Sequence, residues 1–320
     1  MFRGFANLWT IVGLARDLPR DKPFPLRVAG ERVVLFRDTA GKACALVDRC
    51  PHRGVALSLG QVRHGIIECP FHGWRFDGTG ANCHVPWNPD AKRDVLGAMA
   101  LPLRETAGLL WLYTGFDPSD EPQPSESLLQ PGVVLCAQSA LWQTHWTRAM
   151  ENMLDSPHLP FVHKATIGRF VAPHLAKRMD LSWIETPYGA RIENTIEGRD
   201  RSARLDYRAP NAMELFIDFG GRLFRLMAIC LPVDDRQTRL TIITLRNFAR
   251  WRGFDPYFRR SNRKIADEDK AVLETSDPVA VPPAGQEKSV RTDAPTLAFR
   301  KLYFERFRDS DAIAGRVPDA

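Results

Sequence analysis

The chain carries two short motifs of cysteine and histidine, Cys50-Pro51-His52 and, sixteen residues later, Cys69-Pro70-Phe71-His72-Gly73-Trp74. Proline and glycine beside these residues are typical of tight turns, so each motif is predicted to lie on a loop. Two loops that each present one thiolate and one imidazole can hold a [2Fe–2S] cluster, with both thiolates on one iron and both imidazoles on the other. We therefore expect Cys50, His52, Cys69 and His72 to bind such a cluster.

A Cys2His2 zinc site is the alternative interpretation of these four residues. Zinc sites of that type usually space their ligands as C-x2–4-C followed by H-x3–5-H. Here each cysteine precedes its own histidine, as C-x-H and as C-x2-H, which fits zinc poorly. Four further cysteines have no comparable partner, and we expect them to be small buried hydrophobic residues; they are Cys44, Cys83, Cys136 and Cys230.

A second motif follows in the segment Asn152-Met153-Leu154-Asp155-Ser156-Pro157-His158-Leu159-Pro160-Phe161-Val162-His163. Asp155 and His158 are three residues apart, so they can touch if a helical turn persists. His158 and His163 are five apart, which is roughly 140° around a regular helix, and they converge only if the chain bends at the prolines between them. Two convergent imidazoles and one distant carboxylate would form the facial triad of a mononuclear Fe(II) site. A histidine pair beside prolines can also be merely structural.

Composition places the chain among ordinary globular proteins. It has 320 residues, 44 Lys plus Arg against 38 Asp plus Glu, and 44% hydrophobic residues. That length suggests two domains, and the segment 117–125, rich in Pro, Ser and acids, resembles a linker. We therefore expect domains 1–118 and 119–320. No apolar run reaches the roughly 20 residues of a membrane span, no basic segment resembles a nucleic-acid site, and we expect a soluble, cytoplasmic protein.

Apolar patterning predicts the elements of both domains. The first hundred residues read as a small all-β unit, with strands at Pro25–Ala29, Arg32–Phe36 and Ala43–Val47. In the second domain, helices are expected at Trp142–Asp155, Phe258–Thr275 and Ala294–Arg308. Six strands with short connections, which favour an antiparallel sheet, are expected between the first two helices, at Leu181–Glu185, Ala190–Ile196, Arg204–Arg208, Ala212–Phe219, Arg222–Leu231 and Thr238–Asn247.

The stretches 49–54 and 69–74 resemble the Rieske domain of ring-hydroxylating and related oxygenases. Respiratory Rieske proteins carry a disulfide between the two loops, whereas this chain has Val55 and Phe71 at those positions, which favours the oxygenase branch. The resemblance implies an α+β chain, an all-β Rieske domain followed by a helix-grip catalytic domain whose antiparallel sheet wraps a long helix.

The segment 152–163 resembles the iron-binding stretch of the same family, in the short form of monooxygenases and oxidative demethylases. The resemblance implies that His158 and His163 bind iron and that Asp155 links this iron to a Rieske histidine. It places the third ligand on the helix after the sheet, often within a Glu-Asp pair, which indicates Asp269. Asp267 is the competitor, and a solvated acidic helix face is the alternative for the whole run.

The resemblance also implies partners. A ferredoxin or an NAD(P)H-dependent flavin reductase would deliver electrons, O2 and a small molecule would be the substrates, and a homotrimer would place the cluster of one subunit beside the iron of the next. Three arginines near the loops could dock an acidic ferredoxin; they are Arg49, Arg53 and Arg75.

Three activities remain open. Monooxygenation, including oxidative demethylation, of an aromatic, heteroaromatic or alicyclic molecule is preferred, and cis-dihydroxylation of an aromatic ring is the second possibility. A Rieske electron carrier without oxygenase activity is the third, although a carrier has no use for the histidines after Asp155. Six residues could line an apolar substrate pocket; they are Phe161, Phe170, Phe216, Phe219, Phe224 and Leu226.

Overall fold

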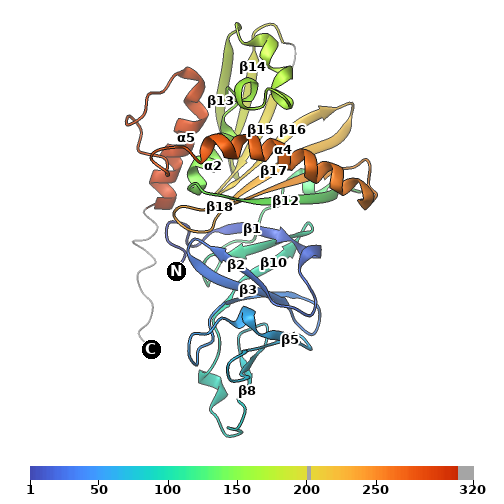
Figure 1. Ribbon diagram of the computed structural model, residues 1–320, viewed down its shortest axis with the longest axis vertical. Coiled ribbons are helices and arrows are strands. Elements are labelled where there is room, and N and C mark those ends of the chain that lie inside the picture. The colour runs from blue at the N-terminus through green and yellow to red at the C-terminus, as the bar shows by residue number, and fades with distance from the viewer. Residues whose placement is uncertain (200–202, 309–320) are drawn as a thin grey trace. The chain divides into compact units, whose positions relative to one another are not determined.

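The computed structural model describes residues 1–199 and 203–308 (Figure 1). It divides into two compact units, Met1–Pro122 and a second unit that begins at Gln123. The division falls within the segment 117–125, a few residues after the boundary expected at residue 118. Residues 200–202 and 309–320 of the expected second domain lie outside the described residues.

The described part of the first unit is built from three antiparallel sheets. Their strands, given in spatial order within each sheet, are β1 (Trp9–Leu14), β11 (Leu109–Tyr113) and β10 (Leu103–Thr106); β2 (Phe24–Val28), β3 (Glu31–Arg37), β4 (Ala43–Val47) and β9 (Ala100–Leu101); and β5 (Gln61–Arg63), β6 (Ile66–Glu68), β7 (Arg75–Phe76) and β8 (Asn82–His84). The all-β prediction is confirmed, and its three strands match β2, β3 and β4 within a residue or two.

One hydrophobic core joins the second and third of these sheets. Val34, Phe36 and Leu46 from the second sheet pack with Ile67 and Phe76 from the third. Cys50 and Cys69 belong to the same cluster of buried side chains. Both cysteines of the sequence motifs therefore sit where two sheets meet, on loops that the core anchors.

The second unit is a seven-stranded antiparallel sheet with its longest helix against one face (Figure 1). Its described strands, in spatial order, are β12 (Val134–Trp142), β18 (Thr238–Arg246), β17 (Arg222–Pro232), β16 (Ala212–Phe219), β15 (Ala203–Arg208), β14 (Gly189–Ile196) and β13 (Met179–Thr186). The described helices are α1 (Glu126–Leu129), α2 (Trp146–Leu154), α3 (Leu159–Val162), α4 (Asp255–Leu273) and α5 (Ala294–Leu302). The antiparallel sheet and its six expected strands are confirmed.

Two expectations for this unit need correction. The helix expected from Trp142 begins only at Trp146, because Trp142 is the last residue of strand β12. That strand was not predicted, since Ala, Ser and Gln occupy much of it and weaken its β pattern. The helix expected at Ala294–Arg308 is regular only to Leu302 and continues as a π-helical turn, Tyr303–Phe307.

Long helix α4 defines which face of the sheet is covered. Asn262 of α4 donates a hydrogen bond to Thr244 of β18, and the ring of Phe258 lies against Phe224 of β17. Successive residues of a strand point to opposite faces, and Phe224 pairs with Ile217 in register. The next register pair, Phe216 with Arg225, therefore points away from α4, toward the outer face.

Candidate metal centres

The two cysteine loops of the first unit share one backbone design. In the first loop the amide of Gly54 donates to the carbonyl of Cys50, and the amide of Cys50 donates to Val55, both at 2.8 Å. In the second loop Gly73 and Cys69 repeat this pattern. The two glycines have φ values of +71° and +70°, a left-handed conformation that glycine adopts without steric cost. The repeated sequence Cys-Pro-x-x-Gly thus encodes two matching turns.

Each loop buries its thiol and exposes its imidazole. Cys50 and Cys69 are each 2% exposed, whereas His52 and His72 are exposed, with ring centroids 4.6 Å apart. Trp74 stacks on His52 with nearly parallel planes, 4.6 Å between centroids. Burial raises the pKa of the Cys50 thiol to about 11, so a thiolate there needs a cation beside it. A buried pair of thiols and an exposed pair of imidazoles fit a [2Fe–2S] cluster in which two cysteines bind one iron and two histidines bind the other.

The remaining cysteines have mixed environments. Cys44, Cys136 and Cys230 are buried, as expected, whereas Cys83 is only half-buried. All six cysteines are free of disulfides.

In the second unit, a bent segment brings the two other histidines together. Helix α2 ends at Leu154, and Asp155 is its C-cap with extended backbone. The single turn α3 then runs between the histidines, with His158 immediately before it and His163 immediately after it. Pro160 lies in the first turn of α3, where its missing amide is not needed. The expected bend between the histidines is therefore present.

Asp269 of α4 completes a three-residue group with these histidines. Its Oδ1 is 3.1 Å from His163 Nε2 and 3.6 Å from His158 Nε2, and the three side chains offer ligand atoms within 4.8 Å of one another. Asp269 Oδ1 is buried, and no described group donates a hydrogen bond to it. Two imidazole nitrogens and a carboxylate oxygen that converge in this way suit a divalent cation such as Fe(II). Asp267, the competing ligand, is exposed.

The second nitrogen of each imidazole also meets a carboxylate. His158 Nδ1 is 2.8 Å from Asp155 Oδ2, which also accepts the backbone amide of His158 at 3.1 Å. His163 Nδ1 is 2.8 Å from Glu268 Oε2. Glu268 was not singled out from the sequence, although its position directly before Asp269 could have suggested a role.

Electrostatics around His163 favour positive charge near its ring. Burial alone lowers the pKa of this histidine, but the adjacent carboxylates of Asp269 and Glu268 outweigh burial, and the net direction is upward. The same carboxylates would attract a metal ion in place of a proton, since both positive species neutralise the same oxygens.

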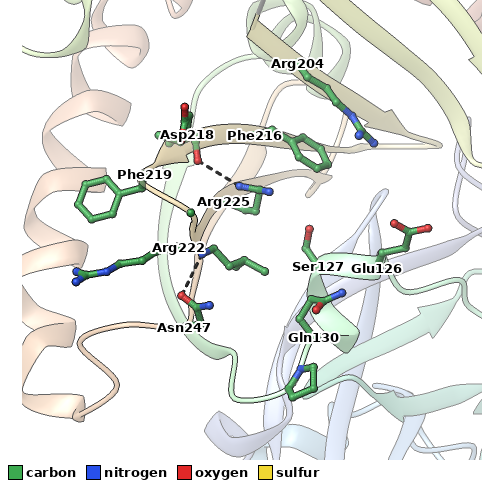
Figure 2. Close-up of a pocket in the computed structure, with 14 residues that line it drawn as sticks. Glu126, Ser127, Gln130, Arg204, Phe216, Asp218, Phe219, Arg222, Arg225 and Asn247 are labelled. Carbon is green, nitrogen blue, oxygen red and sulfur yellow. Dashed lines mark hydrogen bonds between the residues drawn. The ribbon is translucent and has the colours of Figure 1, made fainter.

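A cavity of about 700 Å³ lies on the other face of the sheet (Figure 2). Arg204, Phe216 and Arg225, which are neighbours across three strands, line it opposite helix α1. The guanidinium groups of Arg204 and Arg225 lie 4.0 and 4.5 Å from the centre of the Phe216 ring. None of the three residues of the triad lines this cavity.

This arrangement sorts the six residues expected to line a substrate pocket. Phe216 points away from the triad, while Phe224 and Leu226 lie on the face that carries α4. Phe219 stacks on Phe248 near that face, at 4.9 Å. Phe161 and Phe170 are 59% and 62% exposed.

Comparison with known proteins identifies both units. The Rieske [2Fe-2S] domain profile matches residues 8–98, and the profile described as the vanillate O-demethylase oxygenase C-terminal domain matches residues 142–306, half of the chain. The chain belongs to the Rieske oxygenase family. It accordingly carries a Rieske [2Fe–2S] domain, and its oxygenase domain implies a mononuclear iron site.

Similar proteins cover most of this Rieske oxygenase. Chlorophyllide a oxygenase of Chlamydomonas reinhardtii is 34% identical over 82% of the chain, which spans 41% of that protein. Methylxanthine N3-demethylase NdmB of Pseudomonas putida is 28% identical over 92% of the chain and 85% of its own length. The solved structure of NdmB superposes with a TM-score of 0.79 at 26% identity, covering 95% of this chain and 94% of its own. The chain thus spans half or less of the first chloroplast relatives.

Among the described residues of this oxygenase, no helix combines the length and apolar character needed to cross a bilayer.

Proposed function

We propose that this Rieske oxygenase is a terminal oxygenase that monooxygenates, or oxidatively demethylates, an aromatic or heteroaromatic small molecule. The observation that carries the proposal is the presence in one chain of two cysteine loops and a separate His-His-Asp group whose buried carboxylate oxygen lacks a hydrogen-bond donor. An electron carrier needs only the first. A similar protein, NdmB, is named as a demethylase of methylxanthines.

We assign the four loop residues to the cluster and three residues of the second unit to Fe(II), namely His158, His163 and Asp269. When bound, the cluster supplies single electrons and the ferrous ion supplies O2 activation. His158 and His163 would coordinate through Nε2, because the Nδ1 atom of each ring contacts a carboxylate at 2.8 Å. The buried position of Asp269 keeps water from competing with its carboxylate.

Asp155 is proposed to link His158 to a cluster histidine of a neighbouring subunit. Its carboxylate accepts two hydrogen bonds from His158 through one oxygen, Oδ2, which leaves the other oxygen for a second partner. This role requires an oligomer in which the two metal centres meet, and we propose a homotrimer on family likeness.

Electrons are proposed to come from NAD(P)H through a flavin reductase or a ferredoxin. Arg49 and Arg53 are exposed beside the first cysteine loop and can attract an acidic partner. Arg75 is less available, because it pairs with Glu68 at 2.7 Å. Reduction rates that fall with ionic strength would support docking through these charges, and salt-independent rates would exclude it. The cytoplasmic location stays a prediction.

The reaction balances as monooxygenation. One oxygen atom of O2 enters a C–H bond of the substrate, and the other leaves as water with two electrons and two protons. If the hydroxylated carbon is an N- or O-methyl group, it then leaves as formaldehyde. Dihydroxylation, the second candidate, places both atoms in the product.

Isotope labelling tests this function. The purified protein, a surrogate reductase and a panel of methylated and unmethylated heteroaromatic compounds are incubated with ¹⁸O2, and product mass and O2 uptake are measured. One labelled atom in the hydroxylated product and one in water for each O2 consumed support monooxygenation. In a demethylation, the labelled atom of the hydroxymethyl group leaves with the formaldehyde. Two labelled atoms in a diol product support dihydroxylation instead. Iron analysis provides the class test, because an electron carrier holds two iron atoms per chain and the oxygenase holds three.

A further inference from the structure

The ring of His163 lies between two successive carboxylates of α4. Its Nδ1 is 2.8 Å from Glu268 Oε2, and its Nε2 is 3.1 Å from Asp269 Oδ1. Successive helical residues point about 100° apart, so a single turn of α4 reaches both edges of the ring. His158 is held differently, because its Nδ1 partner, Asp155, comes from its own segment.

Thr166 fixes the position of the Glu268 carboxylate. Its hydroxyl donates a hydrogen bond of 2.7 Å to Oε2, the same oxygen that contacts His163. The Glu268 side chain is 20% exposed, whereas that of His163 is 1% exposed. Glu268 therefore connects α4 with the loop after α3. Its carboxylate is partly exposed to solvent, whereas the His163 ring that it contacts is buried.

This contact favours the tautomer of His163 that a metal ligand needs. An ionised carboxylate only accepts hydrogen bonds. With a metal ion at the triad, the proton of a neutral ring would therefore lie on Nδ1 beside Glu268, and the Nε2 lone pair would be left for the metal. Without Glu268 the ring could adopt the other tautomer or turn over, and either change removes that lone pair from the triad. Carboxylates that hold the far nitrogen of a ligating histidine also increase its basicity toward the metal.

We propose that Glu268, held by Thr166, is a positioning residue that orients His163 and slows the loss of divalent metal from the triad. This inference rests on the proposed function, since it requires metal at the His158, His163 and Asp269 group. It assigns different tasks to two similar contacts: Asp155 serves electron transfer between centres, and Glu268 serves metal retention within one centre.

The decisive variant is Glu268→Gln, which keeps the size of the side chain and removes its charge. Asp267→Asn is the matched control, because it makes the same change one residue earlier on the exposed side of α4. The measurement is the rate at which the purified, fully loaded enzyme loses its third iron to a ferrous chelator, with cluster absorbance recorded in parallel. We expect loss roughly 10- to 100-fold faster in Glu268→Gln and unchanged in Asp267→Asn. Equal rates in the two variants would overturn the proposal.

The hydroxyl of Thr166 provides a second, independent test. Thr166→Val removes the donor with little change in volume, and Thr166→Ser keeps it. We expect faster iron loss and an altered resonance spectrum of the ferrous nitric oxide adduct in Thr166→Val, with both restored in Thr166→Ser. If Thr166 only connects the loop to the helix, Thr166→Val will lower thermal stability and leave that spectrum unchanged. This outcome would contradict the proposal.

These outcomes separate the two hypotheses. A wild-type protein that reproducibly holds only two iron atoms contradicts the proposed function and this inference with it. A wild-type protein with three iron atoms, whose Glu268 and Thr166 variants retain metal normally, overturns this inference alone.

Discussion

The two candidate metal centres are built on opposite principles. The cluster loops are local: each closes on itself through backbone hydrogen bonds within a five- or six-residue turn and a left-handed glycine. The triad is non-local, since His163 meets Glu268 across 105 positions of the chain. A local site depends on the turn that contains it, whereas a non-local site depends on the packing of whole elements. Perturbations should therefore spread differently from the two centres.

Removing one proposed ligand from each centre should have the largest effect. Cys50→Ala is expected to abolish the visible spectrum of the cluster while the triad retains its iron, because the two ligand sets share no residue. His163→Ala is expected to leave the cluster spectrum intact and to lower the iron content from three atoms per chain to two. Product formation should fall to background in both variants. Metal analysis and paramagnetic resonance check this, and loss of all iron in either variant would contradict independent centres.

Asp155→Asn tests the link between the centres. The amide retains the shape of the carboxylate but lacks its charge, so we expect both metals to stay bound while product formation falls about 100-fold. Single-turnover oxidation of the reduced cluster by O2 measures the effect directly. The control is Asp267→Asn, on the exposed surface of α4. Glu151→Asp would be unsuitable, because Glu151 is buried and forms an ion pair. Full activity of Asp155→Asn would exclude the link.

Much of this difference was readable in the sequence. The cluster motifs are recognisable because each cysteine lies within three residues of its histidine. The prolines near His158 and His163 predict the bend between these histidines. Asp269 could be predicted only through the family resemblance, which places a carboxylate on the helix after the sheet. Glu268 was missed because its contact with His163 is fixed by the packing of α4, and the outward direction of Phe216 depends on a strand register that local patterning does not reveal.

The two cluster loops allow a finer comparison between similar turns. Gly54→Ala and Gly73→Ala both force alanine into a left-handed conformation, which costs about 1–2 kcal/mol. A Cβ at position 54 meets open space, whereas one at position 73 lies 3.2 Å from the side chain of Pro86. We expect both variants to lose the cluster at lower urea concentration, Gly73→Ala more so. The midpoint of the loss of cluster absorbance in urea measures this difference. Equal midpoints would show that the Pro86 side chain moves aside at no measurable cost in stability.

Acid sensitivity of the second unit tests its dependence on distant contacts. Glu287 bridges Arg148 of α2 and Arg300 of α5, with nitrogen to oxygen distances of 2.6 Å to each. Hydrogen bonds from Arg148 and then Arg300 lower the pKa of Glu287 from its ordinary value of 4.5 to about 2. A carboxyl group with a depressed folded-state pKa stabilises the fold above its unfolded pKa, and that stabilisation is lost as pH falls through the folded pKa.

Glu287→Gln should therefore be less stable than wild type at neutral pH, and the difference should shrink as pH falls from about 4.5 toward 2. Glu151, on the same arginines, acts in the opposite direction because burial raises its pKa, so only the difference between variant and wild type isolates Glu287. Thermal unfolding followed by far-ultraviolet circular dichroism across this range provides the measurement, with Asp267→Asn as the control expected to track wild type. A wild-type advantage that persists undiminished at pH 2 would mean that Glu287 contributes through its shape rather than its charge.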